Sequence, residues 1–228
     1  MTIPPLIVFD LDGTLVDTAP DLVGALNFVL QREGLPLVPV ASARTMIGAG
    51  ARKLIERGLE LEGRAVGVAD IDRLTNDFIA YYKDHIADAS RPFDGLHAAL
   101  DKLEGQGFKF AVCTNKLEGL SRLLLAKLEM TGRFAAICGA DTFGVAKPDP
   151  TILRQTIAQA GGEVSRSIMV GDSGPDVGVA RRAGVPVIGV SFGYTEIPIA
   201  ELKPDMVIDH MRELPNAVER LLKTPVTH

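Results

Sequence analysis

The residues best suited to chemistry follow a short apolar run near the N-terminus. Residues 6–9 are apolar, and Asp10, Asp12 and Gly13 come directly after them. In an extended chain, residues i and i+2 point to the same side, so the two carboxylates face one site. Gly13 lets the chain turn away at once. Such a pair of carboxylates can supply a nucleophile, an acid–base group or metal ligands.

The Asp-x-Asp-Gly pattern is not specific when it stands alone. Asp is common at helix N-caps and in turns, and the same pattern forms part of calcium-binding loops. The calcium interpretation requires a bidentate Glu six residues after Gly13, but that position is Ala19. The motif therefore has to be judged together with the other polar residues of the chain.

Polar and charged residues that suit the same site as Asp10 and Asp12 follow three later apolar runs, at 108–113, 135–138 and 167–170. Their hydroxyl, amide and ammonium groups can hold phosphate oxygens. Four converging carboxylates would repel one another in a partly desolvated site, and a hard divalent cation relieves this. Mg²⁺, with few protein oxygens, waters and a phosphate oxygen, is the natural choice. The residues are Thr114 and Asn115, then Lys147, then Asp172, Ser173 and Asp176.

These runs also predict the fold that must bring the polar groups together. They do not alternate with polar residues, which is typical of parallel strands covered on both faces. Amphipathic segments between them predict helices and hence a doubly wound, Rossmann-like α/β domain, whose ligands sit at the carboxyl ends of the strands. The predicted strands are 6–9, 108–113, 135–138, 167–170, 185–190 and 206–208, and three of the predicted helices are 96–103, 117–128 and 152–160.

One segment, residues 18–87, lacks a convincing strand and predicts an inserted all-α cap. The remaining residues, 1–17 and 88–228, would form the catalytic core. The cap's first helix opens with Thr18 as a plausible N-cap and Asp21 as the acidic residue of its first turn. Further helical patterns begin at Ala51 and span 71–86.

Composition excludes several other classes of protein. The 228 residues carry a formal net charge of −5 and no block of Lys or Arg, which argues against nucleic-acid binding. The longest charge-free stretch, 183–195, is too short to span a bilayer, and the N-terminus lacks a signal-peptide pattern. The two cysteines predict reduced thiols in a cytoplasmic protein. Composition leaves open whether the protein is a monomer or a dimer.

The order Asp-x-Asp-Gly-Thr, Thr-Asn, Lys-Pro and Gly-Asp-x-x-x-Asp resembles the haloacid dehalogenase (HAD) superfamily of aspartyl-phosphate phosphatases. The match covers essentially the whole chain, including a helical cap after the first motif. The resemblance implies that Asp10 is the nucleophile and Asp12 the general acid–base. It implies that Thr114 and Lys147 bind the phosphoryl group, with Asn115 assisting.

The same resemblance implies a metal site and its supporting residues. Mg²⁺ (or Mn²⁺, which the sequence does not separate from it) would be held by the Asp10 side chain, the Asp12 carbonyl and Asp172. Asp176, with Ser173 beside it, would orient Lys147 or a metal-bound water. The superfamily's dehalogenases do not need the second Asp as an acid, so Asp12 favours phosphoryl chemistry.

The cap sequence narrows the expected substrate. Gly48 and Gly50 predict a turn at a helix start, where exposed N–H groups favour an anion, and Arg52 follows in the first helical turn. A cation there is unfavourable for the helix dipole, which suggests an anionic partner outside the helix; a merely solvated Arg52 is the alternative. This segment and residues 17–22 look similar to the phosphoglycolate phosphatase branch, whose substrate is a small phosphorylated acid.

Two alternatives remain open from the sequence. One is a β-phosphoglucomutase-like phosphosugar mutase, or a phosphatase for another small phosphate ester, on the same fold. The other is a non-enzymatic module in which a partner recognises phosphorylated Asp10. An acid at Asp12 and a cap of about 70 residues have no evident purpose in such a module.

Overall fold

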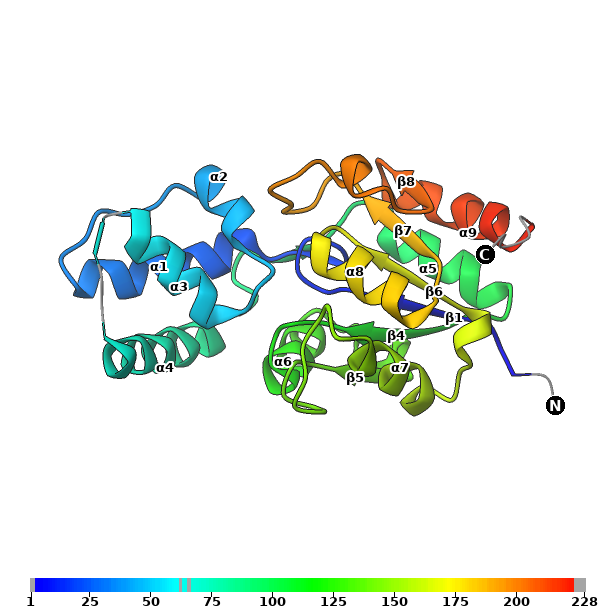
Figure 1. Ribbon diagram of the computed structural model, residues 1–228, viewed down its shortest axis with the longest axis horizontal. Helices are drawn as coiled ribbons and strands as arrows, with labels where there is room; N and C mark the ends of the chain where they lie inside the picture. The colour runs from blue at the N-terminus through cyan, green and yellow to red at the C-terminus, as the bar shows by residue number, and fades with distance from the viewer. Residues whose placement is uncertain (1–2, 62, 65–66, 224–228) are drawn as a thin grey trace.

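A parallel sheet forms the centre of the larger domain. The computed structural model describes residues 3–61, 63–64 and 67–223. Within them, six parallel strands lie in the order β5-β4-β1-β6-β7-β8 (Figure 1). The strands are β1 (Leu6–Phe9), β4 (Lys109–Cys113), β5 (Ala136–Cys138), β6 (Ser167–Gly171), β7 (Val187–Val190) and β8 (Met206–Ile208). β1 lies between β4 and β6, so Asp10 leaves the sheet near its middle.

Both faces of this sheet are covered by helices, which explains why the strands lack polar alternation. Ile7 and Phe9 pack on the face shared with α5, α6 and α9, and Leu6 and Val8 pack on the face shared with α7 and α8. The helices are α5 (Leu96–Gly105), α6 (Glu118–Lys127), α7 (Pro150–Gln159), α8 (Gly174–Ala183) and α9 (Leu214–Lys223). The predicted doubly wound α/β fold is confirmed.

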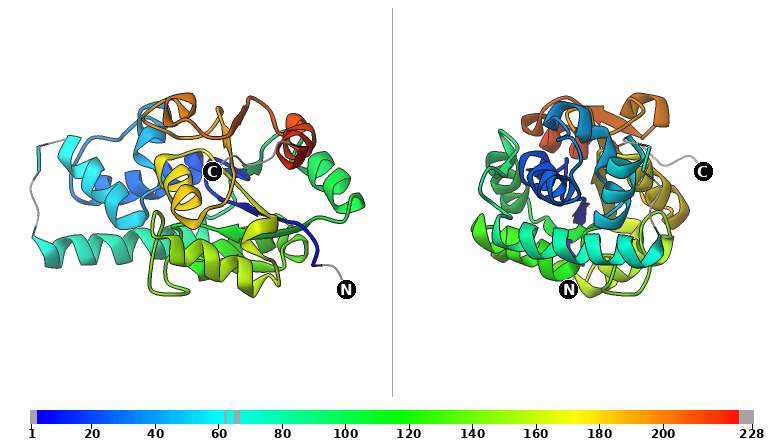
Figure 2. Two further views of the ribbon diagram at one scale, coloured as in Figure 1. Left: turned by 45° about the vertical axis from the view of Figure 1, so that its right-hand side comes forward. Right: turned by 90° about the vertical axis from the view of Figure 1, so that its left-hand side faces the viewer.

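A group of helices forms a second lobe beyond the carboxyl edge of the sheet (Figure 1). It comprises α1 (Ala19–Arg32), α2 (Val40–Ala43), the short 3₁₀ turn η1 (Arg44–Met46), α3 (Ala51–Leu61) and α4 (Val68–Asp84). The end-on view in Figure 2 shows α1 and α3 together above α4, and the three pack on one another. On α4, residues at helical spacing are buried against them: Ile71, Leu74, Phe78 and Tyr82.

Two short connections join this helical lobe to the sheet domain. The chain leaves through β2 (Val16–Asp17) and returns through β3 (Arg91–Pro92), and these two strands pair antiparallel. The sequence did not predict this pair, because two residues are too few to show a periodic pattern. The four-residue helix α2 and the turn η1 were missed for the same reason.

Two residues at the start of α1 occupy the predicted N-cap and first-turn positions, but their side chains bond to other parts of the protein. Thr18 occupies the N-cap position but makes no side-chain cap bond; its hydroxyl donates to Asp12 Oδ1 at 2.7 Å. The Asp21 carboxylate accepts from the backbone of Ala89 and from both the N–H and the hydroxyl of Ser90, at 2.6–3.1 Å. Both residues thus tie α1 to the site and to the returning chain.

The described helices include none that is both long enough and apolar enough to cross a membrane.

Candidate active site

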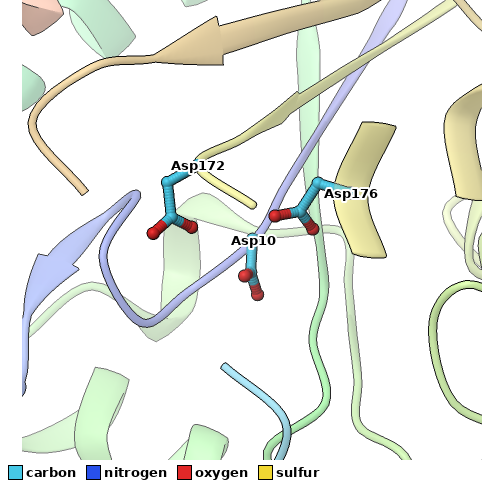
Figure 3. A group of neighbouring side chains, drawn as sticks. All are labelled: Asp10, Asp172 and Asp176. Carbon is cyan, nitrogen blue, oxygen red and sulfur yellow. The ribbon is translucent and has the colours of Figure 1, made fainter. Parts of the chain in front are cut away.

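Three carboxylates from distant parts of the chain meet at the carboxyl edge of the sheet. Asp10 follows β1, Asp172 follows β6, and Asp176 lies in the first turn of α8. One oxygen of each lies within 4.8 Å of an oxygen of the other two, and Figure 3 shows their carboxylates turned toward a common space. All three residues are at least 95% buried. Such a cluster needs a compensating cation.

Lys147 supplies part of that positive charge. Its Nζ lies 2.8 Å from Asp10 Oδ1 and 2.6 Å from Asp176 Oδ1. Burial lowers the pKa of Lys147, but the charges of Asp10 and Asp176 outweigh this and raise it, so the ammonium stays charged. Burial raises the pKa of Asp10 from 3.8 to about 6, and Lys147 opposes that rise. One lysine therefore does not balance three acids.

Asp172 is positioned by its neighbours on both sides. Its Oδ2 accepts the backbone N–H of Tyr194 at 2.6 Å, and its Oδ1 accepts the hydroxyl of Thr14 at 3.1 Å. A Cβ on Gly13 would lie 2.4 Å from Asp172 Oδ2, and one on Gly193 would lie 2.2 Å from Asp172 Cβ, so both positions require glycine. Burial, followed by the charges of Asp176 and Asp10, raises the pKa of Asp172.

Ser173 and Asp176 fix the start of α8 as a capping box. Asp176 Oδ2 accepts from the Ser173 N–H at 3.0 Å and from its hydroxyl at 2.5 Å. The other oxygen of Asp176 remains for Lys147. The structure therefore places one Asp176 oxygen on the start of α8 and the other on the ammonium of Lys147.

Asp12 points to a different set of partners from those of Asp10. Lys116 Nζ lies 2.9 and 3.1 Å from its two oxygens, and Thr18 donates to Oδ1. The same ammonium donates to the hydroxyl of Tyr82, on α4, at 2.9 Å. Neither Lys116 nor Tyr82 was predicted from the sequence. A cation two residues after Thr114 was the available signal for Lys116, whereas Tyr82 reaches the site only through the packing of the helical lobe.

Thr114 and Asn115 follow β4, and their side chains have different partners. Thr114 is buried at the strand end, and its Oγ1 accepts the N–H of Lys116. The Asn115 amide is occupied by backbone groups: Oδ1 accepts the Lys147 N–H at 2.8 Å, and Nδ2 donates to the Lys147 and Gly48 carbonyls. These bonds favour a positioning role for Asn115, which links Lys147 to the Gly48 loop of the helical lobe.

The cap residues singled out from the sequence have different surroundings. Gly48 and Gly50 adopt φ of +110° and +88°, which favours glycine, and both line the space above the site. Arg52 also lines that space, but it forms ion pairs with Asp72 and Glu56 of the cap, and its side chain is 46% exposed. The anionic partners of Arg52 are therefore carboxylates of the helical lobe itself, whereas the sequence suggested a partner outside the helix.

The raised pKa of Asp10 leads to a prediction about metal-free protein. A carboxyl whose pKa is higher in the folded state contributes stability below pH 3.8 and loses it as the pH rises through about 6. In EDTA, Asp10→Asn should therefore be more stable than the unsubstituted protein at pH 7, and this gap should close towards pH 4. Thermal unfolding across this range checks the prediction, and a pH-independent gap would contradict it.

Comparison with known proteins identifies the family. The family model for haloacid dehalogenase-like hydrolases matches residues 7–190. A phosphoglycolate phosphatase of Mesorhizobium japonicum is 46% identical over 220 residues, covering 96% of this chain and 97% of that protein. One of Agrobacterium fabrum is 48% identical over 219 residues, covering 96% and 94%.

A solved structure agrees with this family. A predicted phosphoglycolate phosphatase of Haemophilus somnus matches 96% of this chain and 99% of that one, with a TM-score of 0.87 and 29% identity. The shared sequence and fold extend over both the sheet domain and the helical lobe. The chain therefore belongs to the haloacid dehalogenase-like hydrolases.

Proposed function

We propose that this protein is a Mg²⁺-dependent phosphatase that hydrolyses 2-phosphoglycolate to glycolate and phosphate through an aspartyl-phosphate on Asp10. The observation that carries the proposal is the buried contact of Asp10 with Lys147, beside Asp172 and Asp176, at the end of β1. The names of relatives at 46–48% identity support the substrate. We also propose that residues 18–87 act as the specificity cap, and that the enzyme works in the cytoplasm.

The donor set fits a divalent cation of hard character. Three buried carboxylates share one space with a single ammonium, and oxygen ligands of this kind suit Mg²⁺. The side chains of Asp10 and Asp172, with the carbonyl of Asp12, would hold it. When bound, Mg²⁺ supplies charge neutralisation for a phosphoryl oxygen and for the nucleophilic carboxylate.

Each protein group then has a defined task in the two half-reactions. The Asp10 carboxylate attacks phosphorus in line with the leaving oxygen, and Asp12 protonates that oxygen. Lys147 and Thr114 hold the equatorial phosphoryl oxygens, where charge is concentrated. Asp12 then takes a proton from water as the water attacks the aspartyl-phosphate, which releases phosphate and restores Asp10.

The lining of the cavity above Asp10 favours a substrate with few hydroxyl groups. The cavity has a volume of about 240 Å³ and lies between the strand ends and the cap. Its cap side is mainly apolar and offers few groups for sugar hydroxyls. The larger apolar residues on that side are Leu22, Ile47, Leu54, Phe78 and Ile79.

A comparison of phosphate esters tests the proposed substrate. Values of kcat/KM should be highest for 2-phosphoglycolate, by about tenfold or more over glucose 6-phosphate and p-nitrophenyl phosphate. Net isomerisation of β-glucose 1-phosphate would instead identify a mutase. A stable phosphoprotein without turnover would identify a regulatory module. Either result would overturn the proposal.

Metal dependence gives a separate prediction. Because Mg²⁺ relieves the repulsion among Asp10, Asp172 and Asp176, it should raise the Tm of the metal-free protein. At a Mg²⁺ concentration 100 times its Kd, the free energy of unfolding should rise by about 2.7 kcal/mol. In Asp172→Asn, the Mg²⁺ concentration needed for the same stabilisation should be at least about tenfold higher. A Tm insensitive to millimolar Mg²⁺, or a phosphatase fully active in EDTA, would contradict the metal site.

A further inference from the structure

The cavity above Asp10 contains a buried cation that the reaction described so far leaves without a task. Among the described residues that line the cavity, the cations are Arg52 and Lys116. A phosphorylated acid carries a second anion beyond its phosphate, and a buried carboxylate requires a positive or hydrogen-bonding partner. The cation that lies where this second anion binds would therefore determine the specificity for phosphorylated acids.

Arg52 is poorly suited to this task. Its guanidinium already forms ion pairs with Asp72 and Glu56, and almost half of its side chain is exposed. A substrate carboxylate would have to compete with two protein carboxylates in a solvated setting, where each added ion pair contributes little.

Lys116 has the opposite surroundings. Its side chain is 5% exposed, and its Nζ lies 4.6 Å from the centre of the Tyr82 ring as well as 2.9 Å from the Tyr82 hydroxyl. Burial lowers its pKa, but Asp12 and Tyr82 outweigh that effect and raise it, so Lys116 carries its charge into the cavity. A charged group held this way by the core and the cap is pre-organised for an anion.

The position of Lys116 matches the leaving-group side of the site. Its N–H donates to Thr114 Oγ1, so the side chain begins next to the phosphoryl pocket. Its Nζ ends on Asp12, the group that would protonate the leaving oxygen. In 2-phosphoglycolate, a single methylene separates that oxygen from the carboxylate. An oxygen placed at Asp12 therefore brings the carboxylate within reach of Lys116.

We propose that Lys116 binds the carboxylate of the leaving group and is the residue that selects phosphorylated small acids. The inference rests on the proposed phosphatase function and names the group that recognises its substrate class. Tyr82 holds the ammonium from α4, so the binding position for the carboxylate is complete only when the cap lies over the core.

The test compares two substrates that differ only in the anion. Ethyl phosphate has the chain length of 2-phosphoglycolate but a methyl group in place of the carboxylate. In Lys116→Met, the kcat/KM ratio of 2-phosphoglycolate to ethyl phosphate should fall about 100-fold. A residue that only positions Asp12 would lower both values together and leave the ratio unchanged, and that result would overturn the proposal.

Two further variants keep the proposal testable even if Lys116→Met does not fold. Tyr82→Phe keeps the buried ring but removes the hydroxyl that holds the ammonium, so the same ratio should fall about threefold to tenfold. Arg52→Met tests whether Arg52 binds the carboxylate instead. If this variant lowers the ratio while Tyr82→Phe does not, the carboxylate site belongs to Arg52 and the proposal fails. If the unsubstituted enzyme does not prefer 2-phosphoglycolate over ethyl phosphate, the proposed function fails instead.

Discussion

Asp10→Asn is expected to lower kcat by about 10⁴-fold or more, the scale on which loss of a covalent nucleophile acts. Asparagine is nearly isosteric with aspartate, so it can still accept the Leu11 N–H that Asp10 Oδ1 accepts at 2.7 Å. Its neutral amide, however, cannot displace a leaving oxygen from phosphorus. Steady-state assays with 2-phosphoglycolate and p-nitrophenyl phosphate measure the effect.

The control for this variant is its fold. In EDTA at pH 7, Asp10→Asn should unfold at a higher temperature than the unsubstituted protein, because it removes one of the mutually repelling carboxylates. A well-folded variant with no turnover assigns the loss to chemistry. Turnover within tenfold of normal in a folded variant would mean that Asp10 is not the nucleophile.

The second large effect is expected from Lys147→Met, which should damage both stability and activity. Methionine fills a similar volume but leaves Asp10 and Asp176 without the ammonium that contacts them at 2.8 and 2.6 Å. Removing one partner of a buried ion pair costs about 3–5 kcal/mol. Removing a donor to the transferred phosphoryl group costs about 10²–10³-fold in kcat.

Two measurements separate these two roles of Lys147. Mg²⁺ should return part of the lost stability in urea or thermal unfolding, since it also neutralises the carboxylates, but it should not restore kcat. Lys102→Met, a substitution of an exposed lysine on α5, is the matched control and should change neither property appreciably. A Lys147→Met protein as stable as the control in EDTA would show that the acidic cluster does not depend on this cation.

The sequence predicted the strands and the polar site residues that come directly after them in the chain. The apolar runs that became β1, β4 and β6 lack alternation because helices cover both faces of the sheet. The polar residues that follow those strands meet because parallel strands end at one edge. The meeting of Asp10 with Asp172 was thus predictable from strand ends, and Asp176 joins them from the first turn of the helix that follows β6.

Residues whose roles depend on the packing of one lobe against the other were not predictable. Lys116 turns into the cavity because Asp12 attracts it from the core and Tyr82 from α4, and no local pattern signals that meeting. Thr18 has the sequence of a helix cap, but the nearby Asp12 carboxylate takes its hydroxyl. In both cases, a tertiary contact outweighs the local preference.

The residue that receives the phosphoryl group can be identified directly. Asp12→Asn should slow hydrolysis of the intermediate more than its formation from p-nitrophenyl phosphate, because nitrophenolate leaves without protonation. The phosphorylated protein should therefore accumulate. Borohydride reduction converts an aspartyl-phosphate to homoserine, which peptide mass spectrometry locates.

If Asp10 is the nucleophile, homoserine should appear at position 10 in Asp12→Asn, and none should appear when Asp10 is also replaced by asparagine. Mg²⁺ should be required for the label to form. Homoserine at another aspartate, or a burst of nitrophenolate with no modified residue in the quenched protein, would contradict the mechanism.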